Sequence, residues 1–281
     1  MSTTPSHPHV DHTADPPWAR DRHLHRSAVV ASLRAAGCVY AEDEADLLLA
    51  EASSPGDLAA LVARRVSGVP LELVVGWADL CGVRVGIGPG VFVPRRRTAL
   101  LARVALSLVP AEVSHPVVVD LCCGSGAIGA VLVAAMPHVE LHAADVDPGA
   151  VACARRNLPG HAVHLGDLYE PLPRQLRGSV HLVVANTPYV PTDELRLLPR
   201  DVLDHEPAVA LDGGDDGLDV QRRVASGVRE WLVPGGHLLV ETSAQQAAAS
   251  VEAMAAAGLV TRLVASPDED ATVVVGRVRE R

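Results

Sequence analysis

The stretch VVVDLCCGSGAIG, residues 117–129, decides the fold of this chain. Its three valines predict a strand that is buried on both faces, as parallel strands between two helical layers are. Gly124 and Gly126 predict a tight turn in which the backbone approaches a ligand closely. The apolar run from Ala127 to Ala135 predicts a helix, whose N-terminus offers free N–H groups and the positive end of a dipole. The stretch therefore predicts a strand, a ligand-binding turn and a helix.

Strand-like and helix-like segments alternate on both sides of this stretch. We expect helices at 98–108 and 148–157, and further strands at 139–144, 162–164, 181–185, 237–241, 259–265 and 271–278. Such alternation predicts an α/β fold with a doubly wound, Rossmann-like sheet of seven strands and helices on both faces. Ligands of these sheets bind at the carboxyl ends of the strands, near the point where the strand order reverses.

Two further parts are expected ahead of this α/β domain, which we assign to 97–281. Apolar residues at helical spacing over 23–70 predict a small helical domain. It carries no evident catalytic group, so substrate recognition or scaffolding is its expected role. The β-like runs Leu71–Val75 and Val83–Ile87 predict a β-hairpin linker over 71–96.

The N-terminal residues 1–22 are polar and rich in His and Pro, which predicts a disordered tail. Its histidines His7, His9 and His12 have no carboxylate or cysteine framework beside them, so we expect no metal site there.

The composition narrows the expected partners and location. The formal net charge is −10, whereas nucleic-acid binders usually carry a basic surface, so a nucleic-acid partner is not expected. The five cysteines are odd in number and lack zinc-site spacing, which predicts a reduced, cytoplasmic protein. Neither a membrane-length apolar run nor a signal-peptide stretch is present, so we expect no membrane association.

Asp120 separates two interpretations of the glycine turn. The spacing of Gly124, Gly126 and Gly129 also fits the G-x-G-x-x-G of dinucleotide-binding folds. A carboxylate beside the turn would repel a pyrophosphate, but it suits a cationic sulfonium ligand. The D-L-x-x-G-S-G form resembles the first motif of S-adenosylmethionine methyltransferases. This resemblance implies S-adenosylmethionine as cofactor, with contacts from Asp120, Cys122, Cys123, Gly124, Ser125 and Gly126.

Two further acids are expected to hold the cofactor. Asp145 ends the next strand, 19 residues beyond Gly126, close to the spacing of about 20 at which a ribose-binding acid is found. It would accept hydrogen bonds from both ribose hydroxyls, whereas Asp147 is better placed to cap the helix that follows. Asp167, with Leu168, follows the short strand at 162–164 and is placed to meet the adenine amino group.

The segment Asn186-Thr187-Pro188-Tyr189 ends a buried strand and carries the predicted catalytic chemistry. An amide nitrogen is a poor nucleophile, because its lone pair is delocalised, so it needs positioning and acceptors for its two hydrogens. The Asn186 side-chain oxygen and the backbone carbonyl before Pro188 supply these acceptors. Tyr189 would stack on the planar group, and Pro188 fixes the turn. We therefore expect all four residues to bind substrate, with Asn186, Pro188 and Tyr189 catalytic, and Asn186 also to border the cofactor.

Together these motifs resemble the PrmC/HemK-type protein-(glutamine N(5)) methyltransferases, over roughly residues 63–278. Val93-Pro94-Arg95 and the segment Glu206-Pro207 with 210–214 resemble further motifs of that family, and generic methyltransferases lack the second of these. The resemblance implies a helical substrate-recognition domain, a hairpin linker and a seven-strand catalytic domain. It also implies a protein substrate from the translation machinery, methylated on a glutamine amide in a release factor or a ribosomal protein, with Glu206 binding substrate.

Three departures from the family pattern suggest a side branch. The usual N-P-P-Y carries Thr187, the usual P-x-T-E is read as Arg96-Arg97-Thr98-Ala99, and a motif glycine is Cys122. Two alternatives stay open at this point. One is an adenine amino-group methyltransferase acting on DNA or RNA, because an exocyclic aromatic amine must be positioned in the same way as an amide nitrogen. The other is a non-catalytic module that binds cofactor and a partner.

Overall fold

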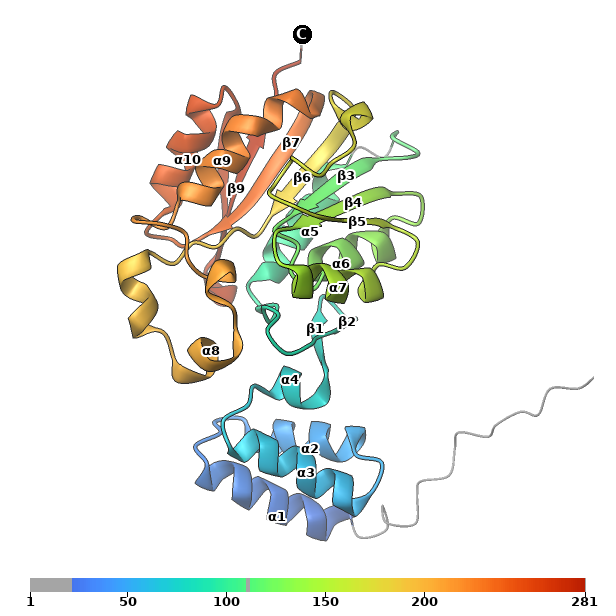
Figure 1. The fold of residues 1–281 in the computed structure, drawn as a ribbon, viewed down its shortest axis with the longest axis vertical. Coiled ribbons are helices and arrows are strands. Elements are labelled where there is room, and N and C mark those ends of the chain that lie inside the picture. Colours follow the sequence, from blue (N-terminus) through green and yellow to red (C-terminus); the bar gives the residue numbers. More distant parts are fainter. Residues whose placement is uncertain (1–21, 110–111, 281) are drawn as a thin grey trace, which may run out of the picture. The chain divides into compact units, whose positions relative to one another are not determined.

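The computed structural model describes residues 22–109 and 112–280, so the expected tail at 1–22, with its three histidines, lies outside the described residues apart from Arg22. The chain divides after Val75 into two compact units (Figure 1). Among the described residues, no helix is long and apolar enough to cross a membrane.

From Arg22 on, where the description begins, the N-terminal unit consists of four helices, α1 (Arg22–Ala35), α2 (Ala41–Glu51), α3 (Pro55–Val66) and α4 (Leu71–Val75). Ser54 caps α3 by accepting a hydrogen bond from the Asp57 N–H, and proline occupies the first position of that helix. Leu33 and Leu48 are fully buried in the core between the helices. The Arg65 guanidinium binds both carboxylate oxygens of Glu44, at 2.6 and 3.1 Å.

The expectation of a β-like run at Leu71–Val75 is wrong, because these residues form α4. The Val74 N–H donates to the Pro70 carbonyl, and the buried Val74 side chain joins the core of the helical unit. A short apolar run carries no periodicity that separates strand from helix. The expected hairpin does exist, but its strands are β1 (Trp77–Leu80) and β2 (Val83–Gly86), paired antiparallel.

A seven-stranded sheet in the order β5-β4-β3-β6-β7-β9-β8 forms the centre of the second unit (Figure 1). Its strands are β3 (Val117–Leu121), β4 (Glu140–Asp145), β5 (Ala162–Leu165), β6 (Val180–Ala185), β7 (Leu232–Thr242), β8 (Val260–Ser266) and β9 (Ala271–Arg277). All pairs are parallel except those of β9 with β7 and β8. The expected α/β fold with a doubly wound, seven-strand Rossmann-like sheet is thus confirmed, and its strand order reverses between β3 and β6.

Helices α5 (Thr98–Leu108), α6 (Ala127–Ala135) and α7 (Pro148–Asn157) pack side by side, while α9 (Asp219–Gly227) packs on α10 (Ala247–Ala256). Successive side chains of a strand point to opposite faces of the sheet, so alternate residues of β3 face different helices. Val119 and Leu121 lie in the core shared with α9 and α10, whereas Asp120 faces α6. Between β6 and α9 the chain forms a largely irregular segment with the short helix α8 (Arg200–His205).

Candidate functional site

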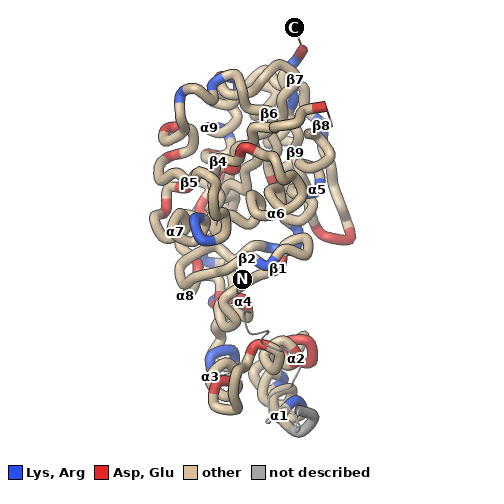
Figure 2. The backbone as a smooth tube through the Cα atoms, turned by 90° about the vertical axis from the view of Figure 1, so that its right-hand side faces the viewer, with Lys and Arg blue, Asp and Glu red and all other residues tan. Residues whose placement is uncertain are grey.

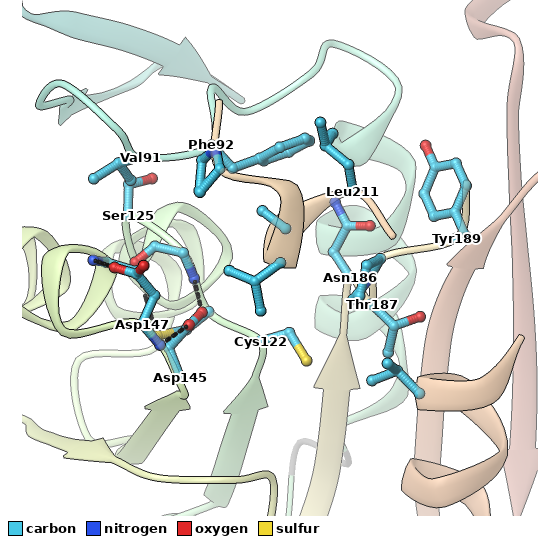
Figure 3. Close-up of a pocket in the computed structure, with 18 of the residues that line it drawn as sticks. Val91, Phe92, Cys122, Ser125, Asp145, Asp147, Asn186, Thr187, Tyr189 and Leu211 are labelled. Atoms are coloured by element: carbon cyan, nitrogen blue, oxygen red, sulfur yellow. Dashed lines mark hydrogen bonds between the residues drawn. The ribbon is translucent and has the colours of Figure 1, made fainter. Parts of the chain in front are cut away.

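A cavity of about 600 Å³ opens at the carboxyl ends of β3, β4 and β6, where the strand order reverses (Figure 3). Its wall comes chiefly from residues 90–98, 122–128, 144–150, 186–190 and 198–211. Both the predicted cofactor motif and the predicted catalytic motif border this one cavity.

The glycine turn after β3 brings backbone N–H groups to the cavity wall. Gly126 has φ 77°, and a Cβ on it would lie 2.9 Å from Leu158 Cδ1, so only glycine lets α6 begin this close to α7. Cys122 also has a positive φ, 54°, and its side chain points into the cavity (Figure 3). Burial raises the pKa of its thiol, which keeps it protonated and neutral. Gly124 and Ser125 line the cavity, whereas Gly126 shapes the turn from behind.

Asp145, at the end of β4, joins two backbone segments at the cavity wall. One carboxylate oxygen accepts a hydrogen bond from Gly124 N at 2.8 Å, and the other accepts from Asp147 N at 2.9 Å (Figure 3). Burial raises the pKa of Asp145, and these two backbone donors oppose that shift. The remaining lone pairs of the carboxylate face a site suited to hydroxyl donors. Asp147 caps α7 by accepting from Ala150 N, as expected.

Asp120 does not line the cavity but lies fully buried behind the glycine turn. Its Oδ2 accepts a hydrogen bond from Gly129 N at 3.0 Å, while Oδ1 has no partner among the described residues. Burial raises the pKa of Asp120 to about 7, and the nearby Asp145 adds to this shift. A buried carboxyl with an unpaired oxygen would gain from a cation bound next to the turn, because such a charge favours ionisation.

The predicted adenine acid lies at the edge of the cavity in an ion pair. Asp167 accepts from Arg223 of α9 at 2.5 Å, and both residues border the cavity, together with Leu168. Arg223 stands next to Arg222 in the chain, and an adjacent arginine pair is equally typical of a solvated helix face, so the sequence alone does not mark Arg223 as part of the site.

The Asn-Thr-Pro-Tyr loop lines the cavity opposite the glycine turn (Figure 3). The Asn186 Nδ2 donates to Thr98 Oγ1 at 3.4 Å, which turns the side-chain oxygen of Asn186 away from Thr98. Thr187 is buried, and its hydroxyl has no hydrogen-bond partner among the described residues. The backbone carbonyl that precedes Pro188 is therefore the group of Thr187 available to a ligand.

Tyr189 is held by two charged residues that the motif analysis did not assign. Arg97 Nη2 donates to the Tyr189 hydroxyl at 2.5 Å, and that hydroxyl donates to Glu241 Oε1 at 3.3 Å. Burial raises the pKa of Tyr189, and so does Glu241, so the phenol stays neutral. Glu241 follows the apolar run of β7, so the sequence marks it only as an acidic residue near the end of a strand.

The segment after α8 clamps the loop from the other side. The Val190 N–H donates to the Leu211 carbonyl, and Gly213 N donates to the Val190 carbonyl. A Cβ on Gly217 would lie 2.3 Å from the Tyr189 carbonyl oxygen, so this approach requires glycine. Gln246 Nε2 completes the clamp by donating to the same carbonyl at 2.9 Å. The stretch 210–214, which the sequence marked as family-specific, therefore fixes the backbone of Val190, while Gly217 and Gln246 fix that of Tyr189.

Glu206 lies beside the cavity rather than in its wall. Its side chain is 1% exposed, and both carboxylate oxygens accept from Arg95 Nη2, at 2.7 and 2.8 Å. Arg95 and Pro207 line the cavity, so Glu206 can affect a bound ligand only through these two neighbours.

Residues 83–198 match the model of the methyltransferase small domain family. With the glycine turn, the β4 acid and the Asn-Thr-Pro-Tyr loop around one cavity, this match defines the chain as an S-adenosylmethionine-dependent methyltransferase. The chain is 38% identical over 201 residues to the release factor glutamine methyltransferase of Geobacter sulfurreducens, covering 69% of each chain. It is 36% identical over 261 residues to that of Mycolicibacterium smegmatis, covering 86% of this chain and 91% of the relative. The chain therefore belongs to the family of release factor glutamine methyltransferases, which confirms the resemblance found in the sequence.

Another relative has a different name. The chain is 36% identical over 222 residues to the 4-amino-L-phenylalanine/4-methylamino-L-phenylalanine methyltransferase of Streptomyces pristinaespiralis, covering 77% of this chain and 75% of the relative.

Proposed function

We propose that this protein methylates the side-chain amide nitrogen of a glutamine in a peptide-chain release factor, and that it does so in the cytoplasm. The observation that carries the proposal is the position of Asn186-Thr187-Pro188-Tyr189, which lies opposite the glycine turn in the same cavity. Membership of the family and the names of the two release factor relatives support the choice of substrate.

The residues at the β3 and β4 ends fit S-adenosylmethionine, which supplies an electrophilic methyl group on a sulfonium cation. Gly124 and Ser125 present backbone to it, and Asp145 has carboxylate lone pairs for ribose hydroxyls. The unpaired oxygen of buried Asp120 favours a cationic ligand. Asp167 would accept from the adenine amino group, with Arg223 fixing its carboxylate. Cys122, Cys123 and Leu168 supply the remaining wall.

The Asn-Thr-Pro-Tyr loop meets the needs of an amide acceptor. The Asn186 oxygen and the Thr187 carbonyl each accept one N–H, which aims the nitrogen at the methyl group. As the bond from nitrogen to the methyl carbon formed and the bond from that carbon to the sulfonium sulfur broke, positive charge would develop on nitrogen, and these two fixed dipoles would stabilise it. Tyr189 walls the planar amide with its ring, and Pro188 holds the carbonyl that precedes it. The nitrogen then loses one of its protons to water.

A second candidate substrate is a free aromatic amine, because one relative is named for the methylation of 4-amino-L-phenylalanine. Phe92 and Tyr189 both line the cavity, and an aromatic ring of either would stack on such a substrate. An arylamine has two N–H groups on a planar system, so Asn186 and the Thr187 carbonyl would serve it in the same way.

Separate assays of the candidate substrates under the same conditions distinguish these functions. The purified protein is incubated with methyl-labelled S-adenosylmethionine and, in turn, a release factor of the same cell, that factor with its candidate glutamine changed to alanine, 4-amino-L-phenylalanine, and DNA or RNA. We expect label on the unmodified release factor only. Label on the free amine or on nucleic acid, with none on the release factor, would overturn the proposal in favour of that substrate.

A further inference from the structure

Asn157 ends α7, and its side chain joins backbone groups from two distant parts of the chain. The Nδ2 atom donates to the Ser125 carbonyl and to the Gly86 carbonyl, at 2.8 Å each. The Oδ1 atom accepts from Gly86 N at 2.9 Å. Both hydrogens of the amide and one of its acceptor positions are therefore used. Asn157 does not line the cavity, so any effect on a ligand must pass through these two partners.

Gly86 is the last residue of the hairpin strand β2, and the Asn157 amide pairs with its N–H and carbonyl as a neighbouring strand would. β2 packs against α6 and α7 (Figure 2). The Cys153 thiol donates to the same Gly86 carbonyl at 3.2 Å. Shortly after Gly86 the chain enters the cavity wall, at residues 90–92. The position of Gly86 therefore sets where this part of the wall begins.

Ser125 is the other partner, and it lies in the glycine turn and lines the cavity. The next residue, Gly126, has φ 77°, and glycine accepts backbone angles of either sign. The peptide between the two can therefore rotate unless its carbonyl is held, and rotation would change which backbone groups face the cavity. The bond from Asn157 holds that carbonyl. Figure 3 shows Ser125 and Val91 at the end of the cavity away from Tyr189, so Asn157 connects two parts of the wall at that end.

We propose that Asn157 is a positioning residue for S-adenosylmethionine, which joins the glycine turn to the end of the hairpin and holds the cofactor half of the cavity in its binding conformation. The inference rests on the proposed function, since that function places the cofactor at the glycine turn. A site held in this way binds more tightly, because the ligand does not have to order it. An amide is required, because it offers two donors and an acceptor on one short side chain. A carboxylate of the same size would set an oxygen against two carbonyl oxygens.

Two substitutions break the link in different ways. Asn157→Ala removes all three hydrogen bonds, whereas Asn157→Asp keeps the size of the side chain and its acceptor but loses both donors. We expect the Kd and the KM for S-adenosylmethionine to rise by about tenfold or more in each variant. At saturating cofactor kcat should stay within about threefold of the wild type, because the link acts on cofactor binding and not on the acceptor loop. Calorimetry measures the Kd, and methylation of the release factor gives KM and kcat.

Two neighbouring variants separate positioning from a loss of packing. Cys153→Ala removes a buried contact of α7 with the Gly86 carbonyl but leaves the bond to Ser125 in place. Arg156→Ala changes the exposed residue before Asn157, whose guanidinium binds a carbonyl of its own helix. We expect both variants to bind S-adenosylmethionine as the wild type does, even where Cys153→Ala lowers the melting temperature. An equal loss of affinity in Cys153→Ala and Asn157→Ala would show a role limited to packing and would overturn the proposal.

The wild type distinguishes failure of this inference from failure of the proposed function. If the wild type methylates the release factor glutamine and both Asn157 variants bind the cofactor with its Kd, only the positioning role is wrong. If the wild type does not bind S-adenosylmethionine, the proposed function itself is wrong. Should both variants fail to fold, hydrogen exchange of the wild type decides. The cofactor should then slow exchange of the Gly86 N–H, which donates to Asn157, more than that of the Leu259 N–H beside the edge strand β8. Equal slowing at both sites would contradict the link.

Discussion

Arg95 and Glu206 form an ion pair, in which the single nitrogen Nη2 of Arg95 lies 2.7 and 2.8 Å from the two carboxylate oxygens of Glu206. The pair joins the loop that leads into α5 with the segment that follows α8, and both of these border the cavity. The two segments are 111 residues apart in the chain, yet each was marked in the sequence as a family motif. Their shared role is to hold one side of the cavity together.

Removal of Arg95 should destabilise the fold more than a surface substitution would. In Arg95→Ala the Glu206 carboxylate, whose side chain is 1% exposed, loses its counter-charge, so we expect a loss of roughly 3 kcal/mol of unfolding free energy. Urea unfolding of the variant checks this, with Arg262→Ala on the edge strand β8 as a control. Equal stability of the two variants would show that the ion pair does not hold the cavity wall.

Thr187→Val should leave activity intact and should not destabilise the protein. The Thr187 hydroxyl is buried without a partner among the described residues, and an unsatisfied buried hydroxyl costs about 1–3 kcal/mol. Valine has nearly the same shape without that group, and the backbone carbonyl that the substrate uses is unchanged. Thermal unfolding and kcat are measured together. A large loss of kcat with normal stability would mean that the hydroxyl itself contacts substrate.

Asp120 should make the stability of the cofactor-free protein fall as pH rises. Its pKa is about 7 in the folded chain against 3.8 for an unperturbed carboxyl. The folded state therefore binds this proton more tightly, so the stabilisation is complete below pH 3.8 and is lost as pH rises through about 7. Asp120→Asn removes the titration, so the wild type should lose more unfolding free energy than the variant between about pH 5 and about pH 8. Parallel pH profiles for the two proteins would contradict this assignment.

The same titration links Asp120 to the cofactor. A cationic ligand favours the ionised carboxyl, so binding below pH 7 must be accompanied by release of a proton. We expect S-adenosylmethionine to bind more tightly as pH rises toward 8 in the wild type and to show a smaller dependence in Asp120→Asn. Calorimetric titration in two buffers of different ionisation enthalpy measures the proton directly. A proton release that is the same in the variant would exclude Asp120 as its source.

The sequence predicts the part of this protein in which local pattern and burial agree. The bounds of α5, α6 and α7 match their expected ranges, because α7 begins at the Asp147 cap before Pro148, and α5 and α6 are marked by their runs of apolar residues. All seven expected strands are present, since segments such as β3 and β6 begin as continuous apolar runs, but β7 begins at Leu232, five residues before its expected start at 237. The helix α4 was missed because a run of five residues, four of them apolar, fits either structure, and packing in the helical unit decides between them.

The sequence predicts only those residues of the candidate site that belong to a motif with recognisable chemistry. Asp145 ends β4 and Asn186 follows β6, the strands on either side of β3, so their positions at strand ends predict that both lie at the same edge of the parallel sheet. Glu241 and Gln246 come from β7 and the turn after it, and nothing local marks them as partners of Tyr189. Arg97 was visible only as a departure from a family pattern, and its pairing with Glu241 depends on a contact 144 residues away in the chain.

The most direct test of the account compares the wild type with Asn186→Ala on a purified release factor. Tandem mass spectrometry locates the methyl group on the substrate, and calorimetry measures the affinity for S-adenosylmethionine in both proteins. We expect the wild type to add one methyl group to a glutamine side chain, and Asn186→Ala to add none while binding the cofactor as tightly. Methylation of that glutamine by Asn186→Ala at the wild-type rate, or no methyl group on any glutamine with the wild type, would contradict the account.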